Sequence, residues 1–180
     1  MRRRLNSAAA ALAAVLAACS PPVAEQSAIV RGDAAYAAGN LDEALAEYRL
    51  ALLQGNEDPE VHGRVAHTYA ALSRVDEAAD HYHEAAAQDS TWADQAVADL
   101  VRLAREADER DDLFGVASAM RRALEFRPGL GVRELALPLA QHYSRSGEYG
   151  RALPFYQRAL SGVPADSAGP LFYEIGQAYE

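Results

Sequence analysis

The chain has 180 residues, with 17 basic and 26 acidic side chains and a formal net charge of −9 at pH 7. This acidic balance argues against nucleic acid as a partner, because binding to phosphates requires clustered positive charge. Cys19 is the single cysteine, so an internal disulfide is excluded.

Residues 1–18 have the order of a secretory signal, with a basic start at Met1–Arg4 followed by an apolar run over Ala8–Ala18. The run is shorter than the roughly 20 residues that a membrane-spanning helix needs. It ends in Leu16-Ala17-Ala18-Cys19, which resembles the lipobox of bacterial lipoproteins. That resemblance implies cleavage between Ala18 and Cys19, with lipid (palmitate-type acyl chains) attached to Cys19. The alternative is an ordinary signal that ends in a cysteine by chance.

The residue after the cysteine bears on localisation. In enterobacterial-type sorting an aspartate there resembles an inner-membrane retention signal, whereas this chain has Ser20. The expected location is therefore the periplasmic face of the bacterial outer membrane, with the outer face of the inner membrane as the alternative. Residues 19–27 are expected to form a lipidated tether, kept extended by Pro21 and Pro22. Cleavage removes three arginines, so the processed chain carries about −12 and is attached to the membrane through the lipid alone.

Beyond the tether, one sequence pattern recurs. It runs from Gly39 to Ala51 and returns 34 residues later from Ser73 to Ala85, with looser copies at 111–123 and 147–159. A fixed period of this size indicates a repeat array. Within each copy, apolar residues recur at i, i+4 and i+7, which predicts one face of a helix. In the first two copies these are Ala44, Tyr48, Ala51 and Ala78, Tyr82, Ala85.

The copies resemble the tetratricopeptide repeat, a helix-turn-helix unit of 34 residues. The resemblance implies an all-α fold, a right-handed α-solenoid of antiparallel helix pairs. About four repeats and a terminal partial repeat would fill residues 28–180. An irregular alanine-rich helical bundle is the alternative.

The third repeat departs from the period, with four additional residues near Ser90–Ala93. We predict a long first helix that is capped by Ser90 or Thr91 and extends to about Glu109, followed by a second helix over 113–126. Trp92 lies in the insertion. It either fills a gap between repeats 2 and 3 or is an exposed anchor for a partner.

The last part of the chain contains two prolines with different expected roles. Pro138 lies near the start of a first helix, whereas Pro154 is expected in the first turn of a second helix, where a missing N–H matters least. The terminal segment is expected to present one apolar stripe that covers the preceding helix. The stripe comprises Phe172, Ile175, Gly176 and Tyr179. We expect it to be the first helix of a longer array, with a solubilising cap as the alternative.

The sequence offers little for catalysis. It contains no zinc-protease, nucleophile-elbow or phosphate-loop motif. His81 and His83 are two residues apart and His62 and His67 are five apart, so neither pair shares one helix face at ligand spacing. We therefore predict no enzyme, no catalytic residue, no metal and no cofactor.

The family resemblance also implies which residues line the groove of the array. They are Arg64, His67, Arg102, Arg105, Gln141 and Arg145. We expect an electropositive strip that binds an acidic or C-terminal peptide segment, because arginine pairs well with carboxylates. The alternative is that Arg105 simply pairs with Asp108 or Glu109. The carboxylate clamp of chaperone adaptors is not implied, since its Lys and Asn positions carry Ile29 and Asp33.

Two functions from different classes follow. The first is a membrane-anchored adaptor or scaffold lipoprotein that binds a protein or peptide partner in the bacterial cell envelope. The second is a permanent structural subunit of an envelope assembly complex, of the outer-membrane protein assembly or pilus biogenesis type, without an exchangeable ligand. An open polar groove favours the first, and an apolar interface favours the second.

Overall fold

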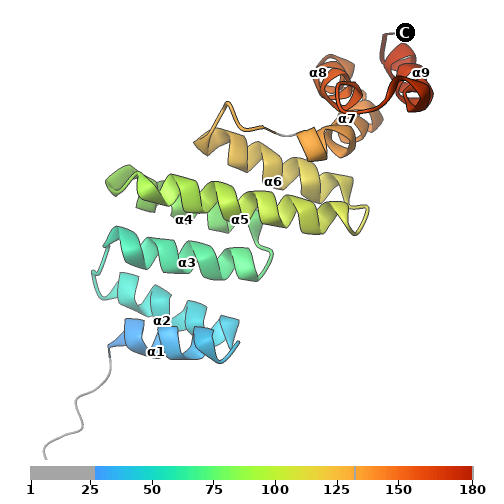
Figure 1. Ribbon diagram of the computed structural model, residues 1–180. Helices are drawn as coiled ribbons and strands as arrows, with labels where there is room; N and C mark the ends of the chain where they lie inside the picture. The colour runs from blue at the N-terminus through green and yellow to red at the C-terminus, as the bar shows by residue number, and fades with distance from the viewer. Residues whose placement is uncertain (1–26, 132, 180) are drawn as a thin grey trace, which may run out of the picture.

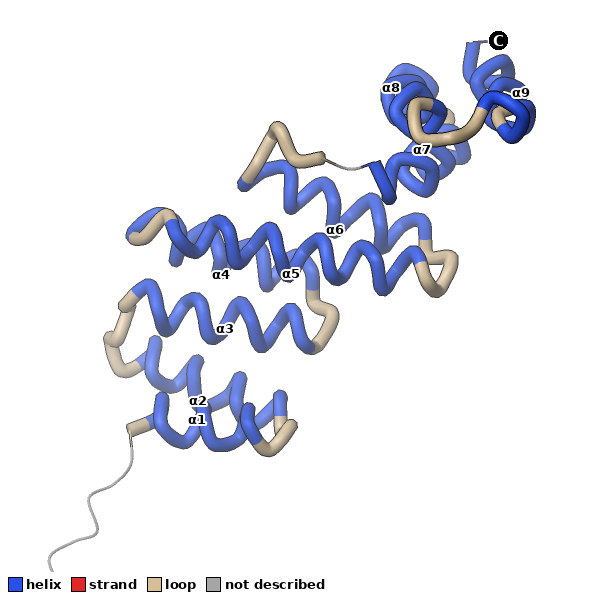
Figure 2. The backbone as a smooth tube through the Cα atoms, in the orientation of Figure 1, coloured by secondary structure: helices blue, strands red, loops and turns tan. Residues whose placement is uncertain are grey.

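The structure, a computed structural model, describes residues 27–131 and 133–179, in which helices follow one another without a β-strand (Figures 1 and 2). Four antiparallel pairs are followed by one further helix, so the predicted all-α solenoid of tetratricopeptide type is confirmed. The helices are α1 Ala28–Ala37, α2 Leu41–Leu53, α3 Pro59–Ala71, α4 Val75–Gln88, α5 Thr91–Asp108, α6 Leu113–Phe126, α7 Ala136–Arg145, α8 Tyr149–Leu160 and α9 Gly169–Tyr179. Short 3-10 turns lie at Arg133–Leu135 and Ala165–Ser167.

The turn inside each pair is set by one repeat position. Gly39, Ser73, Asp111 and Gly147 have φ values of 80°, 58°, 55° and 74°. This left-handed conformation ends the first helix and reverses the chain, and it favours glycine because glycine lacks a Cβ. Repeats 2 and 3 adopt the same turn with Ser73 and Asp111, at a conformational cost that glycine avoids.

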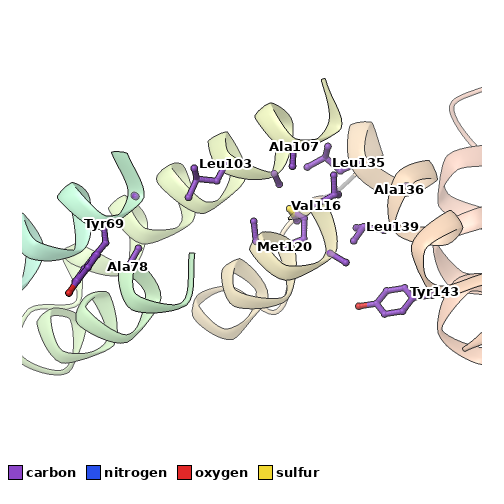
Figure 3. Packing of buried hydrophobic residues seen from close by; sticks show 14 of the residues in the cluster. Tyr69, Ala78, Leu103, Ala107, Val116, Met120, Leu135, Ala136, Leu139 and Tyr143 are labelled. Carbon is purple, nitrogen blue, oxygen red and sulfur yellow. The ribbon is translucent and has the colours of Figure 1, made fainter. Parts of the chain in front are cut away.

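The core follows the predicted periodicity along the whole array. Tyr48, Tyr82 and Tyr156 occupy one repeat position and are 3%, 0% and 1% exposed. The alanines three residues further along each helix are also buried, which allows neighbouring helices to approach closely. Figure 3 shows the core continuing from Tyr69 through Leu103 and Met120 to Leu139.

The long third repeat is as predicted, because α5 extends to Asp108 and α6 spans Leu113–Phe126. Its start differs from the expected cap. Ser90 makes no side-chain cap, whereas the Asp89 carboxylate accepts hydrogen bonds from Thr91 N at 2.9 Å and Thr91 Oγ1 at 2.8 Å. The capping oxygen therefore comes from one residue earlier than predicted.

The prediction for Pro154 is wrong. This residue is the sixth of α8, inside the helix rather than in its first turn, because α8 begins at Tyr149. Its missing N–H leaves the Gly150 carbonyl without the usual i+4 donor.

The expected apolar stripe of the terminal helix is right at Ile175, which packs against the core, and wrong at its other positions. In α9 the buried residues are Leu171 and Ala178, while Phe172 and Tyr179 are 58% and 68% exposed. Gly176 has nothing within 4 Å of the place of a Cβ. The packed face of α9 therefore comprises Leu171, Ile175 and Ala178, so the prediction is shifted by one residue at the two ends of the stripe.

Cys19 and the rest of the predicted signal and tether, up to residue 26, lie outside the described residues. Of the described helices, none combines the length and the apolar character that crossing a membrane requires.

Candidate partner-binding groove

A cavity of about 320 Å³ opens on the face formed by α1, α3 and α5, the first helices of repeats 1 to 3. We call it the first-helix cavity. Its aromatic wall comes from Tyr36, Tyr48 and Trp92, and its polar groups come from Asp33, Arg64, His67, Thr68 and Gln95. Gly63 completes the lining. Because three consecutive repeats contribute, the cavity exists only when the array is assembled.

Trp92 forms one end of the cavity and depends on Gly63. A Cβ at Gly63 would lie 2.3 Å from Cη2 of the indole, so a larger residue there would displace the ring. The indole also lies beside Tyr82, with ring centroids 6.4 Å apart, and it remains half-buried. Trp92 therefore fills the space between α3 and α5, as the first of the two interpretations predicted, and its half-buried indole also lines the cavity.

Asp99 is a buried carboxylate behind the cavity and is only 5% exposed. Oδ2 accepts hydrogen bonds from the buried Tyr82 hydroxyl and from Gln95 Nε2 at 3.3 Å, and it lies 2.7 Å from His67 Nδ1. Burial raises the pKa of Asp99, but the hydrogen bonds from His67 and Tyr82 outweigh it, so the net shift is downward. Asp99 therefore stays ionised and links α3, α4 and α5.

The hydrogen bond to Asp99 likewise raises the pKa of His67 above its ordinary value of 6.5, against the opposing effect of burial. A larger fraction of His67 is then protonated near neutral pH than for a free histidine.

A second cluster joins repeats 1 and 2. Asp33 Oδ1 accepts hydrogen bonds from the Tyr48 hydroxyl at 2.7 Å and from Arg64 Nε at 3.0 Å. Arg64 also lies 3.3 Å from Glu60. Because the Asp33 side chain is 47% exposed, solvent can reach this cluster, unlike the one at Asp99.

Three arginines of the expected electropositive strip, Arg64, Arg102 and Arg105, are matched by carboxylates. Arg102 lies 2.7 Å from Glu106, and Arg105 lies 3.0 Å from Glu134 rather than pairing with Asp108 or Glu109 as the alternative held. Their side chains are 42% and 58% exposed. The face therefore presents paired charges of both signs.

The structure distributes the six predicted groove residues among different places. Arg64 and His67 line the first-helix cavity, whereas Arg105 borders a separate hollow of about 220 Å³ beside Glu134. Gln141 and Arg145 border a third hollow of about 220 Å³ between α7 and α9, with Tyr173 and Glu174. Arg102 lies on α5, one turn beyond Asp99.

Among the residues of this site that sequence reasoning missed are Tyr36, Gln95 and Asp99. The sequence does indicate that Asp99 is buried, because it lies three residues after Ala96 and four before Leu103, on the same apolar face of the helix. A carboxylate on a buried apolar face requires partners. For Tyr36 and Gln95 the sequence carried no comparable signal.

Residues 138–168, which cover most of the fourth repeat, match the tetratricopeptide repeat family. Among solved structures, the crystal structure of MamA protein is similar over 84% of this chain and 79% of that chain, with 19% identity and a TM-score of 0.46. A search of curated proteins gives no match. The helix pairs therefore have the architecture of a tetratricopeptide-type solenoid, and the fourth pair also matches that family in sequence.

Proposed function

We propose that this protein is a non-enzymatic, lipid-anchored adaptor of the bacterial cell envelope, which binds a segment of a partner protein in the first-helix cavity. The observation that carries the proposal is the cavity itself. It is concave and combines three aromatic side chains with five polar ones, and binding sites commonly pair apolar walls with a small number of placed polar groups. The anchoring part rests on the lipobox-like end of residues 1–19.

The chemistry of the cavity favours a segment with an apolar side chain at its centre. Tyr36 and Trp92 can contact such a side chain on two sides, and Gln95 can hydrogen-bond the backbone of the segment. An acidic residue further along the segment could pair with Arg102 or Arg105. Their present ion pairs are exposed and worth about 0–1 kcal/mol each, so a ligand carboxylate can replace them.

Capture from solubilised membranes, followed by mass spectrometry, tests the binding part. Arg64→Gln with Gln95→Ala alters the cavity, and Arg158→Gln with Gln157→Ala is the matched control on the exposed face of α8. We expect the first pair to lose a partner that the control pair retains. Equal capture by both pairs would refute binding in the cavity.

The permanent structural subunit remains a second candidate because of α9. Phe172, Tyr173 and Tyr179 of this helix are 58%, 69% and 68% exposed, and exposed aromatic residues favour a protein interface. A permanent complex would persist on dilution and would survive both cavity variants, whereas the adaptor would exchange its partner.

A further inference from the structure

His62 of α3 and His81 of α4 form a pair on repeat 2 that the cavity does not use. Their Nδ1 atoms are 3.2 Å apart and their ring centroids are 5.4 Å apart. Both side chains are half-buried, and neither is required by the repeat pattern. The two histidines lie 19 residues apart in the chain and on different helices, so their contact cannot be recognised from residue spacing along one helix.

The geometry points to a binding site for a late divalent transition metal, Zn²⁺ or Ni²⁺, with His62 Nδ1 and His81 Nδ1 as its protein ligands, and we propose this site for repeat 2. A metal 2.0–2.1 Å from both nitrogens at their present separation would subtend an angle of about 100°, close to tetrahedral. The ring centroids would then approach to about 5.0 Å, a small adjustment from 5.4 Å.

The surroundings hold the two rings in place. The His81 ring stacks on the Tyr69 ring, with centroids 5.6 Å apart. The Arg74 guanidinium lies over the same Tyr69 ring, 4.6 Å from its centroid. Because α3 and α4 belong to one closely packed antiparallel pair, the backbone positions of both ligands are fixed before a metal arrives. A preformed pair loses less conformational entropy on binding.

Charged side chains of both signs surround this position. Asp80 and Glu84 of α4 act on His81 with negative charge, whereas Arg49 of α2 acts on it with positive charge, and the Arg74 guanidinium lies over the neighbouring Tyr69 ring.

The site supplies only two protein ligands. Across residues 27–131 and 133–179, no three side chains of His, Cys, Asp or Glu are grouped so that they could hold a metal. The remaining coordination positions would be taken by water or by a group from another molecule. This resembles exchangeable sites, which keep open positions, rather than closed structural sites.

The test is metal binding by the full chain, purified in detergent with a histidine-free tag and carrying Cys19→Ala so that no thiol competes. Zn²⁺ and Ni²⁺ are titrated separately by calorimetry, and thermal unfolding is followed by circular dichroism with and without metal. We expect one ion bound per chain and a higher Tm with metal, because a ligand of the folded state stabilises it. His62→Gln and His81→Gln should each weaken binding about tenfold or more and abolish the shift in Tm.

His83→Gln is the matched control, since His83 lies on the same helix but stacks on Phe126 instead. This variant should bind like the wild type, and Ca²⁺ should leave Tm unchanged because it prefers oxygen ligands. The site would be overturned by a wild-type chain that binds neither metal up to millimolar concentration. It would equally be overturned by His62→Gln and His81→Gln chains that remain helical and bind as the wild type does.

Discussion

Replacing Tyr82 by phenylalanine tests the buried link between repeats 2 and 3. The Tyr82 hydroxyl, in a side chain that is 0% exposed, donates to the carboxylate of Asp99, which is 5% exposed. A hydrogen bond to a charged group is worth about 1.5–3 kcal/mol, and water does not reach this place to replace it. We therefore expect Tyr82→Phe to lower the free energy of unfolding by about 2 kcal/mol, which corresponds to a Tm lower by about 4–8 °C.

Tyr48→Phe provides a comparison at the same position of repeat 1. The Tyr48 hydroxyl also donates to a carboxylate, that of Asp33, at 2.7 Å, but the Asp33 side chain is 47% exposed. Because water and Arg64 can satisfy Asp33, the expected cost is about 0.5–1 kcal/mol. Urea unfolding followed by circular dichroism measures both variants, with unchanged m values as the sign that only stability changed. A cost for Tyr48→Phe equal to or above that for Tyr82→Phe would refute the reasoning.

Three further predictions concern the turns, the charged pair and the anchor. Ser73→Gly should raise the free energy of unfolding, measured by urea denaturation, by about 1 kcal/mol, because glycine adopts the φ of 58° at this position without strain. Gly39→Ala should lower it by about as much, and a destabilised Ser73→Gly variant would contradict this reasoning. The His67–Asp99 pair should stabilise most between about pH 4 and 6.5. Because the pKa of His67 is raised in the folded state, its contribution to stability is complete below pH 6.5 and is lost as pH rises through the folded-state pKa. Because the pKa of Asp99 is lowered, its contribution to stability is lost as pH falls through a folded-state pKa below 3.8. Thermal unfolding against pH measures this, and His67→Gln should remove the alkaline loss; a loss of the same size in that variant would point to another group. Cys19→Ala should leave the chain uncleaved or released from the outer-membrane fraction, and a variant that migrates and fractionates like the wild type would count against the anchor.

The sequence predicted the helix pairs well because a period of 34 residues fixes which side chains are buried. The packing positions predicted for the first two copies are all buried in the structure, namely Ala44, Tyr48, Ala51, Ala78, Tyr82 and Ala85. The register of α9 could not be predicted in the same way. In the family, the positions of Gly176 and Tyr179 contact the second helix of the same repeat. In this structure α9 contacts α8 instead, and its buried residues are Leu171 and Ala178.

The site was less predictable, because periodicity says which positions are buried but not how polar groups pair. The family positions indicated Arg64 and His67, yet the partners Asp33 and Asp99 depend on distances between helices of different repeats. The contact of Trp92 with Gly63 likewise joins helices of different repeats, α5 and α3. Such contacts between repeats lie outside what a single repeat motif encodes.

Site-specific photo-cross-linking in cells is the most direct measurement of partner binding in the first-helix cavity. A photoreactive phenylalanine derivative replaces either Gln95, which lines the cavity, or Gln157, which is exposed on α8 away from it. Both positions carry glutamine, Gln95 in α5 and Gln157 in α8, so the two variants differ in the place of the probe and not in the residue that it replaces. The account predicts a discrete cross-linked product from position 95 and none from position 157. Equal products from both positions, or a product from 157 alone, would contradict it.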